Sequence, residues 1–121
     1  MAQTELLGAW GEYQAAEYLR RKGYKILACN YHSRFGEIDI IARKRGVVAF
    51  VEVKLRKNAK CAYAREYVGS QKQMRVRTTA ELWLAENGME LQPRFDVVEV
   101  YAPQGIETSY PQIVHFENAF Q

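Results

Sequence analysis

Two short apolar segments that each carry a carboxylate constrain this 121-residue chain more than any other feature. The segments span 36–41 and 49–54, and their Ile, Val and Phe content predicts β-strands buried on at least one face. Asp39 lies in the first segment and Glu52 in the second. Because a carboxylate in apolar surroundings is costly unless it is paired or holds a metal ion, the pattern indicates a functional site.

The length of the connection decides whether the two carboxylates meet. Side chains alternate along a strand, so Glu52 shares its face with Lys54. A two-residue turn, in which Gly46 can supply a positive φ, would set Asp39 directly across from Glu52. A four-residue turn would leave the pair diagonal on one face, whereas a turn of one or three residues would separate them. With an even-length turn, Asp39, Glu52 and Lys54 converge.

Apolar spacing and stop signals predict one α/β domain over residues 1–121. Helical spacing ends before Gly23, Ser70 with Gln73 resembles a capping box, and Gly88 would stop the helix that this box opens. The expected elements are a helix over 4–22, strands over 24–30, 36–41 and 49–54, a helix from 70 to the stop at 88, and strands over 95–100 and 112–116. This order predicts a mixed sheet covered by helices on both faces.

Composition and charge predict where the protein is located, the state of its cysteines and the kind of partner that it binds. No long apolar run and no signal-peptide pattern occur, which predicts a cytoplasmic protein without a membrane partner. Cys29 and Cys61 are isolated, so reduced thiols are expected. The net charge is +3, and after residue 90 the only cation is Arg94. Positive charge thus gathers in the middle of the chain, which favours a phosphate backbone as partner, although an ordinary solvated face fits the same charges.

The carboxylate strands carry residues suited to phosphodiester hydrolysis. Asp39 and Glu52 could hold Mg²⁺ or Mn²⁺ through hard oxygen ligands, and the ion would lower the pKa of a bound water. Lys54 could orient or deprotonate the attacking water, or stabilise negative charge. The alternative is a buried ion pair between Lys54 and a carboxylate, with no catalysis.

Several cations are candidates for phosphate contacts. Lys72 lies near the start of its helix, where a cation is unfavourable unless it meets an anion. Arg56 follows Lys54 on the same strand face. The predicted nucleic-acid-binding residues are Arg56, Lys72, Arg43, Lys44 and Arg45, and simple exposure is the alternative for each. Aromatic residues are expected in the core instead of in base-stacking positions, namely Trp10, Tyr18, Trp83 and Phe95. Neither histidine has a partner motif, so no catalytic histidine is expected.

Short motifs run through nearly the whole chain: Gly8, Gly11-Glu12, Ala15, Gly23-Tyr24, Asn30, Gly36-Glu37-Ile38-Asp39, Phe50-Val51-Glu52-Val53-Lys54, Arg56, Lys72, Arg94-Phe95-Asp96-Val97-Val98 and Asn118-Ala119-Phe120. On these motifs the chain resembles the YraN family, also called uncharacterised protein family 0102. That family is similar in fold to restriction-endonuclease-like nucleases and archaeal Holliday-junction resolvases. The segment 57–67 departs from the family pattern, in which a glycine and a proline often appear.

The resemblance implies an αβββαβ core in which Asp39, Glu52 and Lys54 correspond to the nuclease motif. It also implies that Glu12 matches the helical glutamate that resolvase-like nucleases bring to the metal site. From helical spacing alone, Glu12 borders the buried stripe, and a solvated or capping role fits equally well. We therefore expect a metal-dependent endonuclease acting on nucleic acid, with DNA favoured and branched forms included. The alternative is a non-catalytic nucleic-acid-binding protein that retains the fold. A homodimer is expected if paired strands are cut, because one small site cuts one strand.

Overall fold

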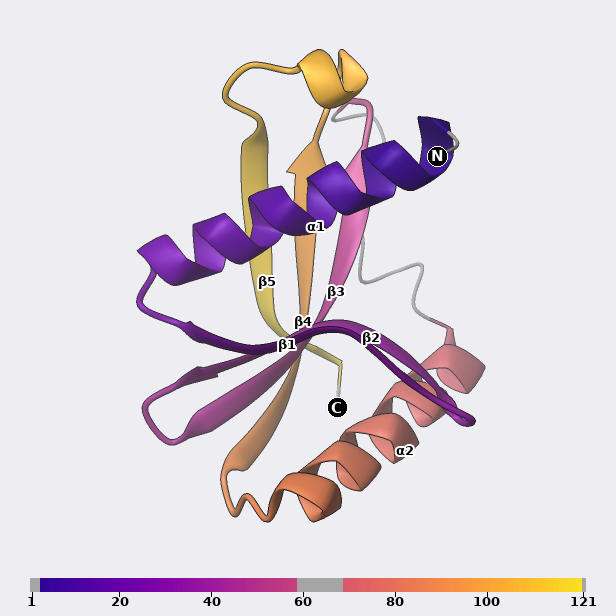
Figure 1. Cartoon of the computed structure of the whole chain (residues 1–121), viewed down its shortest axis with the longest axis vertical. Coiled ribbons are helices and arrows are strands. Elements are labelled where there is room, and N and C mark those ends of the chain that lie inside the picture. The colour runs from indigo at the N-terminus through magenta and orange to yellow at the C-terminus, as the bar shows by residue number, and fades with distance from the viewer. Residues whose placement is uncertain (1–2, 59–68, 121) are drawn as a thin grey trace.

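The computed structural model describes residues 3–58 and 69–120 (Figure 1). In chain order the elements are helix α1 (Gln3–Arg21), strands β1 (Lys25–Ser33), β2 (Gly36–Lys44) and β3 (Val47–Arg56), helix α2 (Ser70–Asn87), strand β4 (Gln92–Tyr101), a 3-10 turn (Gly105–Glu107) and strand β5 (Gln112–Phe120). The expected αβββαβ order is confirmed, and each of the predicted strands is longer than expected.

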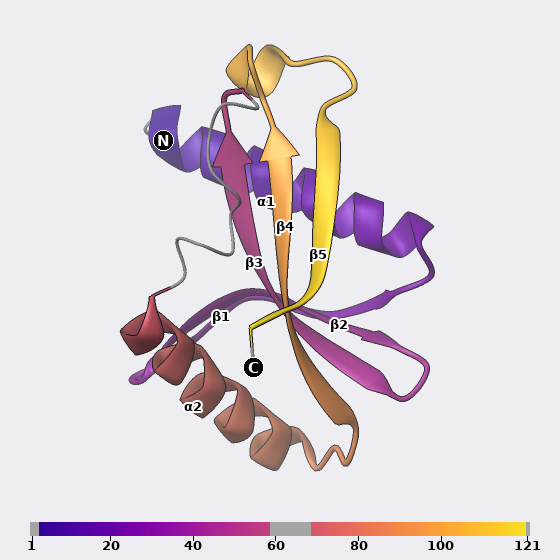
Figure 2. The ribbon, with the colours of Figure 1, turned by 180° about the vertical axis from the view of Figure 1, so that it is seen from behind.

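In the described part of the chain the strands form one five-stranded sheet in the order β1-β2-β3-β4-β5. Neighbouring strands are antiparallel except β3 and β4, which are parallel. A parallel pair needs a long crossover, and α2 lies within that crossover. Helix α1 crosses one face of the sheet and α2 covers the other (Figures 1 and 2). The predicted mixed sheet with helices on both faces is therefore confirmed.

Strand alternation divides the core into two layers. On β3, Phe50 packs toward α2 and Val51 packs toward α1. Two of the aromatic residues expected in the core lie on the α2 side: Trp83 is buried, and Phe95 stacks on Phe50 at a centroid distance of 5.8 Å. The other two, Trp10 and Tyr18, are half-buried against the α1 layer. All four aromatic predictions are thus confirmed as packing residues.

The ends of α2 bear out one prediction and correct another. Gly88 ends the helix in the left-handed conformation with φ 59°, as expected. The capping box predicted from Ser70 and Gln73 is wrong, because Gly69 is the N-cap and makes no side-chain cap bond. Ser70 is already helical, and Gln73 donates its backbone N–H to the Gly69 carbonyl at 2.9 Å.

The turn between β2 and β3 has the even length that the site requires. Lys44 pairs with Val47, so Arg45 and Gly46 alone form the turn. The positive φ belongs to Arg45, at 56°, and not to Gly46 as expected. The reason is geometric. Both turn types that favour two-residue hairpins, I′ and II′, need a positive φ at the first central residue, which here is Arg45.

The remaining expectations concern cysteines and membranes. Cys29 is free, as predicted, and its side chain is exposed, whereas Cys61 lies outside the described residues. Within residues 3–58 and 69–120, no helix combines the length and apolar character needed to cross a membrane.

Candidate active site

Strands β2 and β3, which carry Asp39 and Glu52, separate at Asp39. The β2–β3 ladder ends at the pair Ile40–Val51, and the same register continued by one residue sets Asp39 opposite Glu52. This is the arrangement predicted for a two-residue turn. In place of a further ladder bond, Asp39 Oδ2 accepts a hydrogen bond from the Val53 backbone N–H at 2.8 Å. The carboxylate therefore occupies the point where β2 leaves β3.

Strand β2 is irregular at this point. Ile38 packs in the α2 layer and Ile40 in the α1 layer, although strict alternation would put both on one face. Across the sheet in β1, Asn30 has a left-handed backbone with φ 52°. The alternation predicted from sequence therefore holds on β3 and is interrupted on β2 around Asp39.

A small pocket joins the two carboxylates. Asp39, Glu52 and Lys72 line it together with two further acidic residues, Glu37 and Asp96, and with apolar side chains that include Phe50, Val76 and Phe120. Its cavity volume is about 30 Å³. That space suits a water molecule or a single ion, and it is far too small for a nucleotide.

Glu52 has one satisfied and one unsatisfied oxygen. Its Oε1 contacts the ammonium groups of Lys72 and Lys54, the latter at 3.4 Å. Its Oε2 is buried and has no hydrogen-bond partner among the described residues. Because a buried acceptor without a partner costs about 1–3 kcal/mol, this oxygen favours a cation or donor beside it.

Asp39 resists ionisation in the metal-free protein. Burial raises its pKa to about 6, against the 3.8 of an ordinary aspartate, although the Val53 N–H opposes the rise. The negative charges of Glu12 and Glu52 add to the rise, and Lys72 lowers it. A cation arriving between the carboxylates would reverse the repulsion, so the shift is the one expected at a cation site.

Glu12 approaches from α1 because its neighbour is glycine. A Cβ on Gly11 would lie 2.8 Å from Leu55 Cδ2, so only glycine lets α1 come this close to β3 without a shift of Leu55. Burial raises the pKa of Glu12, a side-chain hydrogen bond with Asn30 lowers it, and the charge of Glu37 raises it. The structure thus brings Glu12 within electrostatic range of Asp39.

The candidate metal site leaves room for ligands other than protein side chains. Among the described residues, no three Asp, Glu, His or Cys side chains lie close enough to hold a metal ion by themselves. Mg²⁺ commonly uses one or two carboxylates and keeps several waters, so the pair Asp39 and Glu52 fits that ion without a third side chain. The predicted ligand role of Glu12 stays a prediction.

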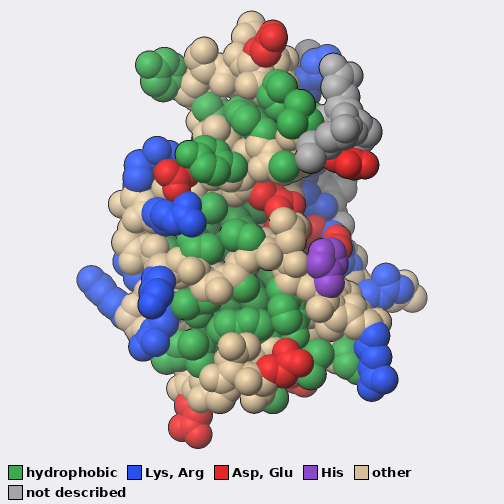
Figure 3. All heavy atoms as spheres, in the orientation of Figure 1, with side chains coloured by type: hydrophobic (Ala, Val, Ile, Leu, Met, Phe, Trp, Pro, Cys, Tyr) green, Lys and Arg blue, Asp and Glu red, His purple; other side chains and the backbone are tan. Residues whose placement is uncertain are grey.

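The predicted nucleic-acid-binding residues fall in different places. Lys72 reaches the pocket, and the anion that it meets is Glu52. Arg56 is mostly buried and pairs with Glu99, with Nε 3.2 Å from Oε2. The other three lie at the end of β2 away from Asp39 and in its turn: Arg43, Lys44 and Arg45. Figure 3 shows Lys and Arg side chains along the left edge of the molecule and at its lower right. Of the five, the structure brings only Lys72 to the carboxylates.

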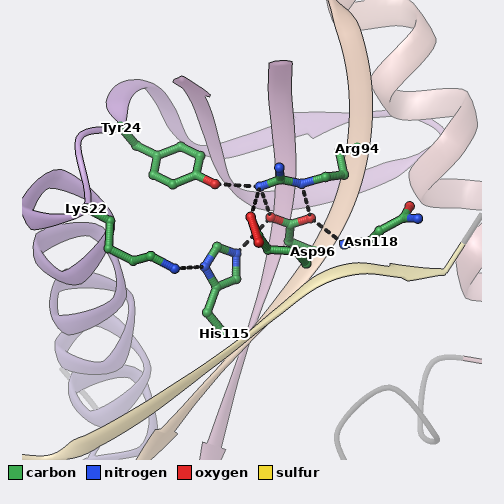
Figure 4. Close-up of polar contacts among 7 residues, drawn as sticks. Lys22, Tyr24, Arg94, Asp96, His115 and Asn118 are labelled. Atoms are coloured by element: carbon green, nitrogen blue, oxygen red, sulfur yellow. Dashed lines mark hydrogen bonds and ion pairs between the residues drawn. The ribbon is translucent and has the colours of Figure 1, made fainter. Parts of the chain in front are cut away.

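A second polar cluster was not foreseen (Figure 4). Asp96 is fully buried and accepts hydrogen bonds from Arg94 Nε and Nη2 at 2.9 and 2.8 Å. It also contacts His115 Nε2 at 2.8 Å and the Asn118 N–H at 3.0 Å. Lys22 Nζ lies 3.0 Å from His115 Nδ1. The cluster ties the end of α1 to β4 and β5.

The charges in this cluster stabilise one another. Burial alone would raise the pKa of Asp96, yet the hydrogen bonds from His115, Arg94 and Asn118 lower it overall. The one signal in the sequence was the same-face spacing of Arg94 and Asp96. The partner of His115 could not be read from it, because the β4–β5 register shifts between Phe95 and Val97.

Fold and site together define a mixed α/β protein with an αβββαβ core and a carboxylate pair where β2 leaves β3. Residues 11–100 match the uncharacterised protein family UPF0102, and the chain belongs to this family, the same one as the YraN family. The resemblance found on the sequence motifs is thereby confirmed.

Relatives match over nearly the full length. A UPF0102 protein of Syntrophotalea carbinolica is 45% identical over 115 residues, which cover 94% of this chain and 90% of the relative. One from Alkaliphilus oremlandii is 45% identical over 117 residues, covering 94% and 97%. One from Agrobacterium fabrum is 42% identical over 120 residues, covering 98% and 91%.

Proposed function

We propose that this protein is a metal-dependent endonuclease that hydrolyses phosphodiester bonds in nucleic acid, with DNA as the favoured substrate. One observation carries the proposal: carboxylates from neighbouring strands, Asp39 and Glu52 among them, line one ion-sized pocket, and Oε2 of Glu52 is buried without a partner in the described chain. Buried polar groups with a purely structural role are normally satisfied. The unsatisfied oxygen therefore supports a ligand-binding role.

Asp39 and Glu52 would hold Mg²⁺ or Mn²⁺. When bound, such an ion lowers the pKa of a coordinated water and offsets negative charge on the phosphate. The apolar side chains of Phe50, Val76 and Phe120 keep the surroundings of the carboxylates low in dielectric, which strengthens each electrostatic contact.

The lysines supply the positive charge that the reaction needs. Lys54 is about one quarter exposed and lies beside Glu52, where it can orient the attacking water or stabilise charge on the phosphate. Lys72 stands in the first turn of α2, and the partial positive charge of that helix end favours a phosphate at the same place.

The same lysines support a second candidate function. Because Lys54 and Lys72 already neutralise Glu52, the cluster can persist without a metal ion. A non-catalytic nucleic-acid-binding protein with this fold would need these lysines and no bound metal ion. Metal binding and turnover separate the two candidates.

Cleavage assays test the proposal directly. We expect the wild-type protein to cut branched, single-stranded or duplex DNA in Mg²⁺ or Mn²⁺ and not in EDTA. Glu52→Gln and Lys54→Met should each lower the rate by about 100-fold or more, as loss of one charge-stabilising group does. Arg21→Ala, an exposed change at the end of α1, serves as the control and should keep the rate. Equal cleavage by all variants would refute the assignment, and binding without cleavage would favour the second candidate.

Metal affinity should depend on pH. Because the pKa of Asp39 is about 6, a metal ion that binds below pH 6 must displace its proton. Affinity for Mn²⁺ should therefore rise about tenfold per pH unit up to pH 6 and then level off. Isothermal titration calorimetry from pH 5 to 8 measures this, with Glu52→Gln expected to abolish binding. A pH-independent affinity would show that Asp39 is not a ligand.

A further inference from the structure

The tip of the β1–β2 hairpin carries residues that its turn does not require. Ser33 pairs with Gly36, so Arg34 and Phe35 form a two-residue turn. Neither residue has a positive φ, so the backbone of this turn does not select for a particular side chain. Phe35 is 38% exposed, and the Arg34 guanidinium lies 4.9 Å from its ring centroid. Turn chemistry therefore gives no reason for an exposed aromatic ring at this tip.

The tip is held firmly against α2. The Phe35 N–H donates to Ser33 Oγ at 3.1 Å, and this oxygen lies 3.4 Å from Thr79 Oγ1. A Cβ on Gly36 would lie 3.3 Å from the Arg75 Cβ and 3.2 Å from Thr79 Oγ1, so the strand runs almost in contact with the helix. The hairpin is thus anchored, and a ligand would lose little entropy in ordering Phe35.

A groove leads from this tip to the carboxylates. It has a volume of about 660 Å³ and lies between the hairpin and the first turns of α2, which stand side by side in Figures 1 and 2. Its lining includes Arg34, Phe35, Glu37, Lys72, Arg75 and Val76. Three of these residues also line the carboxylate pocket: Glu37, Lys72 and Val76. The groove is therefore continuous with the candidate active site, and its size suits one or two nucleotides.

The charge of the groove suits a phosphate backbone. Arg34, Lys72 and Arg75 line it, and its acidic residue, Glu37, lies 3.3 Å from His32 Nδ1. Cations that follow a groove, combined with an exposed aromatic ring, are the elements by which proteins bind single-stranded nucleic acid. Bases inside a duplex are already stacked on both faces, so such a ring can stack only on an unpaired or terminal base.

We propose that the groove binds a single-stranded or splayed segment of nucleic acid, with Phe35 stacked on an unpaired base and Arg34 and Arg75 on its phosphates. The inference rests on the proposed function, because the same strand would continue to Asp39 and Glu52. It defines the substrate class as nucleic acid that is unpaired next to the bond that is cut.

Fluorescence anisotropy with a labelled 12-nucleotide DNA strand, alone and as a duplex, tests the inference in EDTA, where no cleavage occurs. Phe35→Ala should weaken single-strand binding by about fivefold or more, the loss expected for one stacked base, and should weaken duplex binding less, because a duplex offers only its terminal bases. Phe35→Trp should keep the affinity, whereas Phe35→Leu, which is apolar without an aromatic face, should not. Tyr110→Ala removes a ring that is 99% exposed elsewhere and should change nothing.

The salt dependence of binding tests the cations separately. Arg75→Ala should reduce the slope of log affinity against log salt by about 0.7, the value for one phosphate contact on a single strand. An unchanged slope would remove Arg75 from the groove contacts.

The outcomes separate this inference from the proposed hydrolysis. Unchanged single-strand binding by Phe35→Ala, an equal loss on duplex, or full recovery by Phe35→Leu would overturn the stacking role, even if the protein cleaves DNA in Mg²⁺. Conversely, Phe35-dependent binding of single strands without any cleavage would uphold the groove and refute the hydrolase.

Discussion

Replacing Asp39 by asparagine should abolish metal-dependent cleavage and also stabilise the metal-free protein above pH 6. Asparagine keeps the shape of the side chain and an oxygen that can accept the Val53 N–H, but it lacks the charge that a metal ion needs. A loss of at least about 100-fold in rate is expected, as for removal of a group that stabilises charge in the transition state.

The gain in stability follows from the raised pKa of Asp39. Its folded-state pKa is about 6 and its ordinary value 3.8, so the folded protein binds this proton more tightly than the unfolded chain does. Ionisation therefore destabilises the fold progressively between pH 3.8 and 6, and the full effect is present above pH 6. The difference between the two pKa values corresponds to about 3 kcal/mol as an upper limit.

Urea denaturation in EDTA at pH 4, 6 and 8 measures this gain. The difference in unfolding free energy between Asp39→Asn and wild type should grow from pH 4 to pH 6 and then remain constant. Asp39→Ala, which leaves the Val53 N–H without its acceptor, is the matched comparison and should gain less. An inactive Asp39→Asn protein that is less stable at pH 8 would assign this residue a structural role.

Asp96→Ala should destabilise the protein by about 3–5 kcal/mol, the range for removing one partner of a buried ion pair. Asp96 is fully buried, and its removal leaves Arg94, 20% exposed in its side chain, and His115, 1% exposed, without their shared acceptor. The Asn118 N–H loses its acceptor as well. Because the pKa of Asp96 is lowered, its stabilising effect is complete at neutral pH and is lost only as the pH falls through that lowered value.

Glu117→Ala provides a matched control for this prediction. Glu117 also contacts Arg94, at 3.3 Å, but its side chain is 53% exposed, so its removal should cost about 1 kcal/mol or less. Thermal unfolding at pH 7 compares the two variants, and Asp96→Ala should melt well below Glu117→Ala. Equal melting temperatures would show that the buried network contributes no more than a surface pair.

The local features of the fold were predictable from particular residues. Alternation on β3 placed Glu52 and Lys54 on one face, and Gly88 marked the end of α2. These predictions depend on neighbours a few residues away. The capping box at Ser70 failed, because a start signal of this kind can shift by one residue without changing the helix.

The sequence by itself determined two apolar strands that each carry a carboxylate, and the two-residue turn fixed a register that, continued by one residue past Ile40 and Val51, sets Asp39 opposite Glu52. The reason is that strand periodicity is a property of consecutive residues. Only the tertiary structure decided which other groups reach them. Lys72 lies on α2, within the crossover between β3 and β4, and contacts Glu52. Glu12 comes near because Gly11 lets α1 approach β3, and Arg56 pairs instead with Glu99. Three further features depend on how the helices and strands pack: the unsatisfied Glu52 oxygen, the hydrogen bonds of Asp96 and the groove beside Phe35. The sequence could not predict them, because they join residues far apart in the chain.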